Sequence, residues 1–182
     1  MVKLIGITGG IGSGKSTLSK HLVKLKYPVH DSDKVVSNMY IKPKASFIDF
    51  INKCGLEDAV KIKKINKKII TRKIFNNEKI RNKFEKFIHN EVRLDRENFI
   101  KKHSKTSKKV IFLDIPLLLE NNLENIFDWV VCIIATKQKR MNRVLKKNKF
   151  SQSVLKQIFK AQVTDKERKA RSKIIIINNK TK

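Results

Sequence analysis

The chain has 182 residues, of which 40% are hydrophobic, and its 43 lysines and arginines against 16 aspartates and glutamates give a net charge of +27. This length suits one α/β domain with insertions, and the apolar content is enough for a sizeable core. No apolar run approaches the roughly 20 residues that span a bilayer, so we expect neither a membrane protein nor a signal peptide. Cys54 and Cys132 lie far apart in no metal-binding spacing, and we expect reduced thiols in the cytoplasm.

The strongly basic balance would attract polyanions, nucleic acid among them. The excess is mostly lysine and is spread along the whole chain, without a basic stripe interleaved with aromatic residues. The chain is also rich in lysine, asparagine and isoleucine together, the residues that AT-rich codons encode. We therefore expect no obligatory nucleic-acid partner.

The first predicted strand, residues 2–7, leads into a glycine-rich loop and then into a helical pattern. The loop fits the phosphate-binding pattern G-x-x-x-x-G-K-[ST], from Gly9 through Gly14 and Lys15 to Ser16. Glycines let backbone N–H groups approach phosphate oxygens, Lys15 would reach the β- and γ-phosphates, and Ser16 would hold Mg²⁺. ATP with Mg²⁺ is thus the predicted ligand, bound by Gly10, Ile11, Gly12, Ser13, Gly14, Lys15, Ser16 and Thr17.

A short second strand, residues 27–30, runs into Asp31-Ser32-Asp33. In an open parallel sheet, ligands bind beyond the carboxyl ends of the strands, where these aspartates lie. Alternation along an extended segment points Asp31 and Asp33 the same way. We expect Asp33 to take a proton from a substrate hydroxyl, with Asp31 supporting it; the alternative is that one of them caps a helix over residues 34–40.

From about residue 44 to residue 103 the pattern is helical and polar, with apolar residues at three- and four-residue spacing. We predict an insert that is entirely helical. His89 follows Phe87 and Ile88 within this pattern, which by itself favours a partly buried structural histidine.

Two further buried strands are predicted at residues 110–114 and 129–135, because both are continuous apolar runs. The first ends in Asp114. This position suits a Walker B acid facing Mg²⁺, although Asp114 could instead cap the following turn.

The remaining segment, residues 136–160, is predicted to form two helices joined by a turn, and residues 173–178 form a last strand. Arg140, Arg143 and Lys147 share one helix face. They form either a lid that neutralises a transferring phosphoryl group or a solvated basic face. The predicted fold class is α/β: a P-loop NTPase core with a five-stranded parallel sheet flanked by helices and an inserted helical domain, together with a small helical lid if the first interpretation of the arginines holds.

Several motifs in this order resemble dephospho-CoA kinases, and the similarity covers essentially the whole chain. They are GITGGIGSGKST, VHDSD, Ile88-His89, LDIPLLLENN, FDWVV, Gln162 and Asn178-Asn179. The most specific are the doubled glycine Gly9-Gly10, the D-x-D after the second strand, and DIPLLLE at residues 114–120.

The resemblance implies transfer of the ATP γ-phosphoryl to the ribose 3′-hydroxyl of dephospho-CoA, the last step of coenzyme A synthesis, by a cytoplasmic monomer. By position, Asp33 resembles the catalytic base, Lys15 and Arg143 the groups that hold the phosphates, and Asn178 a residue near adenine. It implies a nucleotide-binding core at residues 1–42, 105–136 and 172–182, a CoA-binding domain at 43–104, and a lid with a connecting helix at 137–171. The implied acceptor-binding residues are Thr8, Asp31, Asp33, His89, Leu117 and Leu118.

The chain departs from the family pattern at several positions. Asn90 replaces a proline, Lys147 replaces the second lid arginine, and Lys180 replaces a glycine. Two rival functions remain open on the sequence. One is another small-molecule P-loop kinase, such as a nucleoside-monophosphate kinase, and the other is a basic nucleic-acid-binding NTPase.

Overall fold

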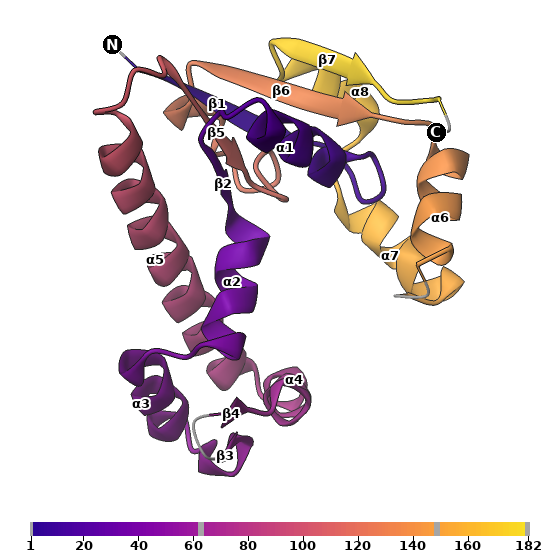
Figure 1. Cartoon of the computed structure of the whole chain (residues 1–182). Helices are drawn as coiled ribbons and strands as arrows, with labels where there is room; N and C mark the ends of the chain where they lie inside the picture. Colours follow the sequence, from indigo (N-terminus) through magenta and orange to yellow (C-terminus); the bar gives the residue numbers. More distant parts are fainter. Residues whose placement is uncertain (1, 62–63, 148–149, 181–182) are drawn as a thin grey trace. The chain divides into compact units, whose positions relative to one another are not determined.

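The computed structural model describes residues 2–61, 64–147 and 150–180 (Figure 1). The chain forms two compact units. The first comprises Met1–Asp31 with Ile100–Lys182, and the second comprises Ser32–Phe99. No helix in the described part of the chain is both long and apolar enough to cross a membrane.

The first unit is built on a five-stranded sheet in the order β2-β5-β1-β6-β7, and every neighbouring pair is parallel. This confirms the predicted sheet. The central strands are apolar on both faces, as sheets covered by helices require, and Ile7, Ile111 and Leu113 are fully buried. The strands are β1 (Lys3–Thr8), β2 (Val29–Asp31), β5 (Val110–Asp114), β6 (Trp129–Ile134) and β7 (Ile174–Ile177).

Helical segments alternate with these strands along the chain, and α1 lies against the sheet. Leu22 of α1 packs with Ile7 and Ile133, so the helix that follows the glycine-rich loop is fixed to the centre of the sheet. At one edge, β7 pairs only with β6 among the described strands, and Ile174 and Ile177 stay exposed. The helices of this unit are α1 (Lys15–Lys24), η2 (Glu124–Ile126), α6 (Lys137–Leu145), α7 (Gln152–Ala161) and α8 (Asp165–Ala170).

The second unit has its own apolar core, in which Phe47, Ile51, Leu56, Ile70 and Phe84 are buried. Its elements are α2 (Ser32–Ile41), α3 (Ala45–Lys53), η1 (Glu57–Ala59), β3 (Val60–Lys61), β4 (Lys64–Ile65), α4 (Lys67–Asn76) and most of α5 (Glu78–His103).

The prediction of an entirely helical insert is wrong in one place, because β3 and β4 form an antiparallel hairpin. Val60 pairs with Ile65, and the N–H of Asn66 extends the pairing to the carbonyl of Ala59 at 2.8 Å. Val60 and Ile65 also pack against the apolar core of this unit, which holds the hairpin in place.

The second unit starts at Ser32, before the expected domain border at residue 43. The reason is packing: Met39 and Tyr40 of α2 lie against the core of this unit. Because α2 starts at Ser32, Asp33 lies in the first helical turn and is not the residue that caps it. The expected functional borders at residues 43 and 104 stay predictions.

Candidate active site

The glycine-rich loop lies between the end of β1 at Thr8 and the start of α1 at Lys15. Gly9 has φ = 147°, and a Cβ atom there would lie 2.4 Å from the carbonyl oxygen of Ile133. Gly14, with φ = 112°, occupies the position that caps α1. Only glycine adopts such positive φ angles readily, and only glycine fits the close approach at Gly9. The loop therefore closes tightly over the start of a helix, whose N–H groups and dipole favour an anion.

Lys15 follows directly, and its Nζ donates to the carbonyl of Gly9 across the loop at 2.7 Å. A phosphate bound at this loop would be a further acceptor for an ammonium group that already lies over the loop. The exposed side chains of Ser16 and Thr17 begin the helix beside it.

The outer side of the loop is tied to the helices that follow β6. The N–H of Ile11 donates to Gln162 Oε1 at 3.0 Å, and its carbonyl accepts from Arg140 Nε at 3.0 Å. The predicted phosphate contact from the Ile11 amide is therefore engaged elsewhere in this structure. With the N–H and the carbonyl of Ile11 engaged in this way, phosphate binding is left to the rest of the loop and to the first turn of α1.

Arg140 does not behave as the predicted lid residue. It is 4% exposed and bonds to Gln162 and Asp165 as well as to Ile11. Burial lowers the pKa of its guanidinium, and the neighbouring Asp165 acts in the opposite direction. Arg140 is thus a residue that supports the loop from behind.

Arg143, one helical turn on, lies beside the same loop. Its Nη1 donates to the carbonyls of Gly12 and Ser13 at 3.3 and 3.4 Å, and its Nη2 to that of Asn178 at 2.9 Å. Asn178 Nδ2 also donates to the carbonyl of Ser13, at 2.8 Å. The structure therefore brings two predicted site residues to the P-loop. Lys147 is exposed in the turn after α6.

Two carboxylates lie at the carboxyl edge of the sheet, as the sequence predicts. Asp31 and Asp114 are paired neighbours on β2 and β5, so their side chains leave the same face. Asp114 is buried and accepts from Ser19 Oγ of α1 at 2.7 Å. Ser16 lies one turn before Ser19 on that helix, so hydroxyl and carboxylate oxygens are gathered near the loop. Hard oxygen donors of this kind suit Mg²⁺ that is also held by phosphates.

Two hydroxyls next to the loop are buried without a hydrogen-bond partner among the described residues. They belong to Thr8, at the end of β1, and to Ser13. An unsatisfied buried hydroxyl costs free energy, so such groups are commonly explained by a ligand or water. Their position agrees with the acceptor-binding role that the family resemblance implies for Thr8.

The other predicted acceptor residues have different surroundings. Leu117 is 44% exposed, whereas Leu118 is fully buried, and a Cβ atom at Gly6 would lie 2.7 Å from its side chain. Leu118 therefore serves the core with its side chain. His89 is exposed on α5, so its interpretation as a partly buried structural histidine is wrong. His89 and Asp33 both belong to the second unit.

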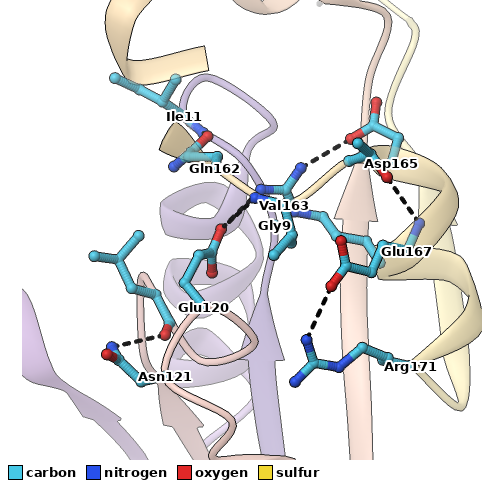
Figure 2. Close-up of polar contacts among 12 residues, drawn as sticks. Gly9, Ile11, Glu120, Asn121, Gln162, Val163, Asp165, Glu167 and Arg171 are labelled. Carbon is cyan, nitrogen blue, oxygen red and sulfur yellow. Dashed lines mark hydrogen bonds and ion pairs between the residues drawn. The ribbon is translucent and has the colours of Figure 1, made fainter. Parts of the chain in front are cut away.

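Sequence reasoning missed the side chains that support the P-loop from a distance. Gln162 and Asp165 lie around the start of α8, and Glu120 lies in the loop after β5 (Figure 2). Arg168 of α8 bonds to both Asp165 and Glu120. No local pattern signals these pairs, because their members are far apart in the sequence. Gln162 and Glu120 have no signal of their own beyond their place in the motifs that the chain shares with dephospho-CoA kinases.

Comparisons with known proteins agree on one family. The model of the dephospho-CoA kinase family matches residues 3–182. A dephospho-CoA kinase from Fusobacterium nucleatum is 32% identical over 98% of this chain and 90% of its own length, and one from Streptococcus mutans is 30% identical over 100% and 91%. Two solved structures have the same fold. The crystal structure of TT1252 from Thermus thermophilus has a TM-score of 0.78 at 26% identity and covers 99% of this chain and 90% of its own. A dephospho-CoA kinase from Campylobacter jejuni has a TM-score of 0.73 at 24% identity and covers 100% of this chain and 90% of its own. With the P-loop built as described, these matches show that the chain belongs to the dephospho-CoA kinase family.

Proposed function

We propose that this protein transfers the γ-phosphoryl group of ATP to the ribose 3′-hydroxyl of dephospho-CoA, giving CoA and ADP in the last step of coenzyme A synthesis. Membership of the family makes it an ATP-dependent kinase. The observation that carries the proposal is the match to the dephospho-CoA kinase family over residues 3–182, and the P-loop, in which Lys15 lies over the carbonyl of Gly9 at the N-terminus of α1, supports it as the nucleotide site.

The proposed mechanism is in-line transfer supported by position and charge. Lys15 and the first N–H groups of α1 hold the triphosphate. Arg143 exchanges its carbonyl partners for phosphate oxygens as charge develops, because a guanidinium bonds more strongly to an anion than to a neutral carbonyl. Asp33 accepts the proton of the 3′-hydroxyl.

Ser16 and Asp114 are the residues that we expect to hold Mg²⁺, with Asp31 beside Asp114. The ion supplies positive charge next to the phosphates. The protein's part is to present oxygen donors from β5 and α1, which the bond between Asp114 and Ser19 fixes relative to each other.

The acceptor is expected to meet Thr8, Asp31, His89 and Leu117, and residues 43–104 are the proposed CoA-binding domain. Residues 137–171 are the proposed lid with its connecting helix, in which Arg143 and Lys147 supply the mobile positive charge. We further propose a cytoplasmic monomer that needs no nucleic acid.

The test is ADP production from ATP and Mg²⁺ with separate acceptors: dephospho-CoA, nucleoside monophosphates, single-stranded DNA, or none. We expect turnover with dephospho-CoA alone, and its loss in Lys15→Ala. Asp33→Asn should lower kcat by at least a hundredfold while leaving ATP binding intact, as expected for loss of a general base. Turnover with a monophosphate would favour the rival small-molecule kinase, and DNA-stimulated hydrolysis that weakens with salt would favour the nucleic-acid-dependent NTPase.

A further inference from the structure

A chain of polar side chains, in which Arg140 and Arg168 are buried and Glu120 and Asp165 are partly exposed, runs between the loop after β5 and the P-loop. Glu120 lies in the loop after β5 and accepts from Arg168 Nη2 of α8 at 3.0 Å. Arg168 also donates to Asp165 Oδ1 at 3.0 Å, and the same oxygen accepts from Arg140 at 3.2 Å. Arg140 Nε then donates to the carbonyl of Ile11 at 3.0 Å. Hydrogen bonds thus connect Glu120 without a break to the nucleotide loop.

A second path starts from the same carboxylate oxygen. Glu120 Oε1 also accepts from the N–H of Val163 at 3.3 Å. Val163 follows Gln162, whose Oε1 accepts the N–H of Ile11 at 3.0 Å. Figure 2 shows Glu120 beside Val163, with Gln162 beside Ile11. Both polar groups of the Ile11 backbone therefore lead back to one oxygen of Glu120, and the two paths close a ring.

Forming this ring costs desolvation free energy, because its charged side chains are removed from water. The side chains of Arg140, Arg168 and Glu120 are only 5%, 3% and 14% exposed. Apolar side chains of similar volume often give equal or greater stability than such buried ion pairs, because they need no desolvation. Apolar contacts lack direction, however, whereas hydrogen bonds fix the orientation of the peptide that they hold.

We propose that Glu120 is a positioning residue for nucleotide binding, acting through this ring on the backbone N–H and carbonyl of Ile11. The ring keeps these two groups engaged with Gln162 and Arg140, so that the remaining N–H groups of the loop are arranged for the phosphates before ATP arrives. Glu120 also ends the segment that begins with the exposed Leu117. The ring therefore links the acceptor segment to the nucleotide loop, a part of the proposal that rests on the proposed function.

The chain offers a matched control, the pair of Glu124 and Arg171. Arg171, at the end of α8, donates from Nε to Glu124 at 2.8 Å. The pair thus also joins the segment after β5 to α8. Within the described residues, neither of its members bonds to the P-loop. Glu124→Gln therefore removes a comparable charge at a comparable place without touching the ring.

The experiment compares Glu120→Gln and Glu124→Gln in the full chain. Calorimetry with a non-hydrolysable ATP analogue and Mg²⁺, without any acceptor, gives the nucleotide Kd, and urea unfolding gives the stability. We expect Glu120→Gln to weaken nucleotide binding about tenfold, the effect of one lost charge-assisted hydrogen bond, and Glu124→Gln to stay within about twofold. Equal Kd values for the two variants would overturn the proposal, whatever their stabilities.

Asp165→Asn supplies a second test should Glu120→Gln fold poorly. Its side chain is 37% exposed, so its loss threatens folding less, yet it joins both arginines of the ring. The same weakening of the nucleotide Kd is expected, and a wild-type Kd would count against the ring. Because this readout contains no acceptor, it stands even if dephospho-CoA proves not to be the substrate.

The link to the acceptor segment has its own readout. In the wild type, adding dephospho-CoA should change the Kd of the ATP analogue. In Glu120→Gln the Kd values with and without dephospho-CoA should be nearly equal, whereas in Glu124→Gln they should differ as much as in the wild type. An undiminished change in Glu120→Gln would refute the link but not the proposed reaction.

Discussion

Gly10→Ala is the sharpest test of how the P-loop is supported. A Cβ atom at Gly10 would lie 2.0 Å from Arg140 Nη2 and 2.4 Å from its Cζ. The alanine must therefore displace a buried guanidinium from Ile11 and Asp165, its partners at 3.0 and 3.2 Å. We expect a loss of about 3 kcal/mol in the free energy of unfolding, the low end for a broken buried pair because Asp165 is partly exposed. For a chain of this size the melting temperature should fall by roughly 6–12 °C.

The assay is urea unfolding of the wild type, Gly10→Ala, Arg140→Ala and the double variant. Because the clash needs the guanidinium, Gly10→Ala should cost less than about 1 kcal/mol when Arg140 is already absent. Gly55→Ala is the matched control: Gly55 has φ = 69° with nothing within 4 Å of a Cβ, so it should show only backbone strain of about 1 kcal/mol in either background. Additive losses for Gly10→Ala and Arg140→Ala would refute the reasoning.

Three further outcomes are expected. Asn178→Ala removes the donor that the Ser13 carbonyl accepts at 2.8 Å, so the ATP KM should rise about fivefold with kcat nearly constant in steady-state assays; an unchanged KM would show that this bond does not hold the loop. Ser19→Ala removes the hydroxyl that donates to the buried Asp114 at 2.7 Å, so the free energy of unfolding in urea should fall by about 2 kcal/mol. Ser19→Thr keeps a hydroxyl and should largely avoid this loss; an unchanged urea midpoint for Ser19→Ala would contradict the prediction. Burial raises the pKa of the Cys132 thiol from 9.0 to about 11. Between these two values the folded protein keeps a proton that the unfolded chain releases, so the thiol's contribution to stability is present below pH 9 and is lost as the pH rises towards 11. Alkylation of Cys132 at pH 8.5, followed by peptide mass spectrometry, should require unfolding; rapid labelling of the folded chain would contradict the burial.

The fold was predictable because its signals are local. The strands β5, β6 and β7 are short, nearly continuous apolar runs, and the glycine pattern marks the turn from β1 into α1. The hairpin of β3 and β4 was missed because its strands are two residues long, too short to show a clear period inside a helical neighbourhood.

The candidate site was predictable only in part. The loop and the two aspartates at the strand ends follow from motif and topology. The burial of Arg140 does not follow from them. Helical spacing places Arg140 on one face with Arg143, but in so basic a chain no local pattern distinguishes a buried arginine from a solvated one. Its burial depends on Asp165, 25 residues further along. The engagement of the Ile11 amide by Gln162 depends on a contact across 151 positions, which no local pattern records.

The open edge of β7 has a consequence for the behaviour of the chain in solution. An exposed, isoleucine-rich strand at the border of a sheet is a template on which another extended segment can pair, and proteins often guard such borders with lysine. Here Lys173 and Lys180 flank the four isoleucines, and both are exposed. The charge of +27 then acts as colloidal protection, by mutual repulsion of molecules that would otherwise associate edge to edge. Light scattering should accordingly show growing self-association as salt screens that repulsion. A signal that does not depend on salt would show that charge repulsion does not keep these molecules apart.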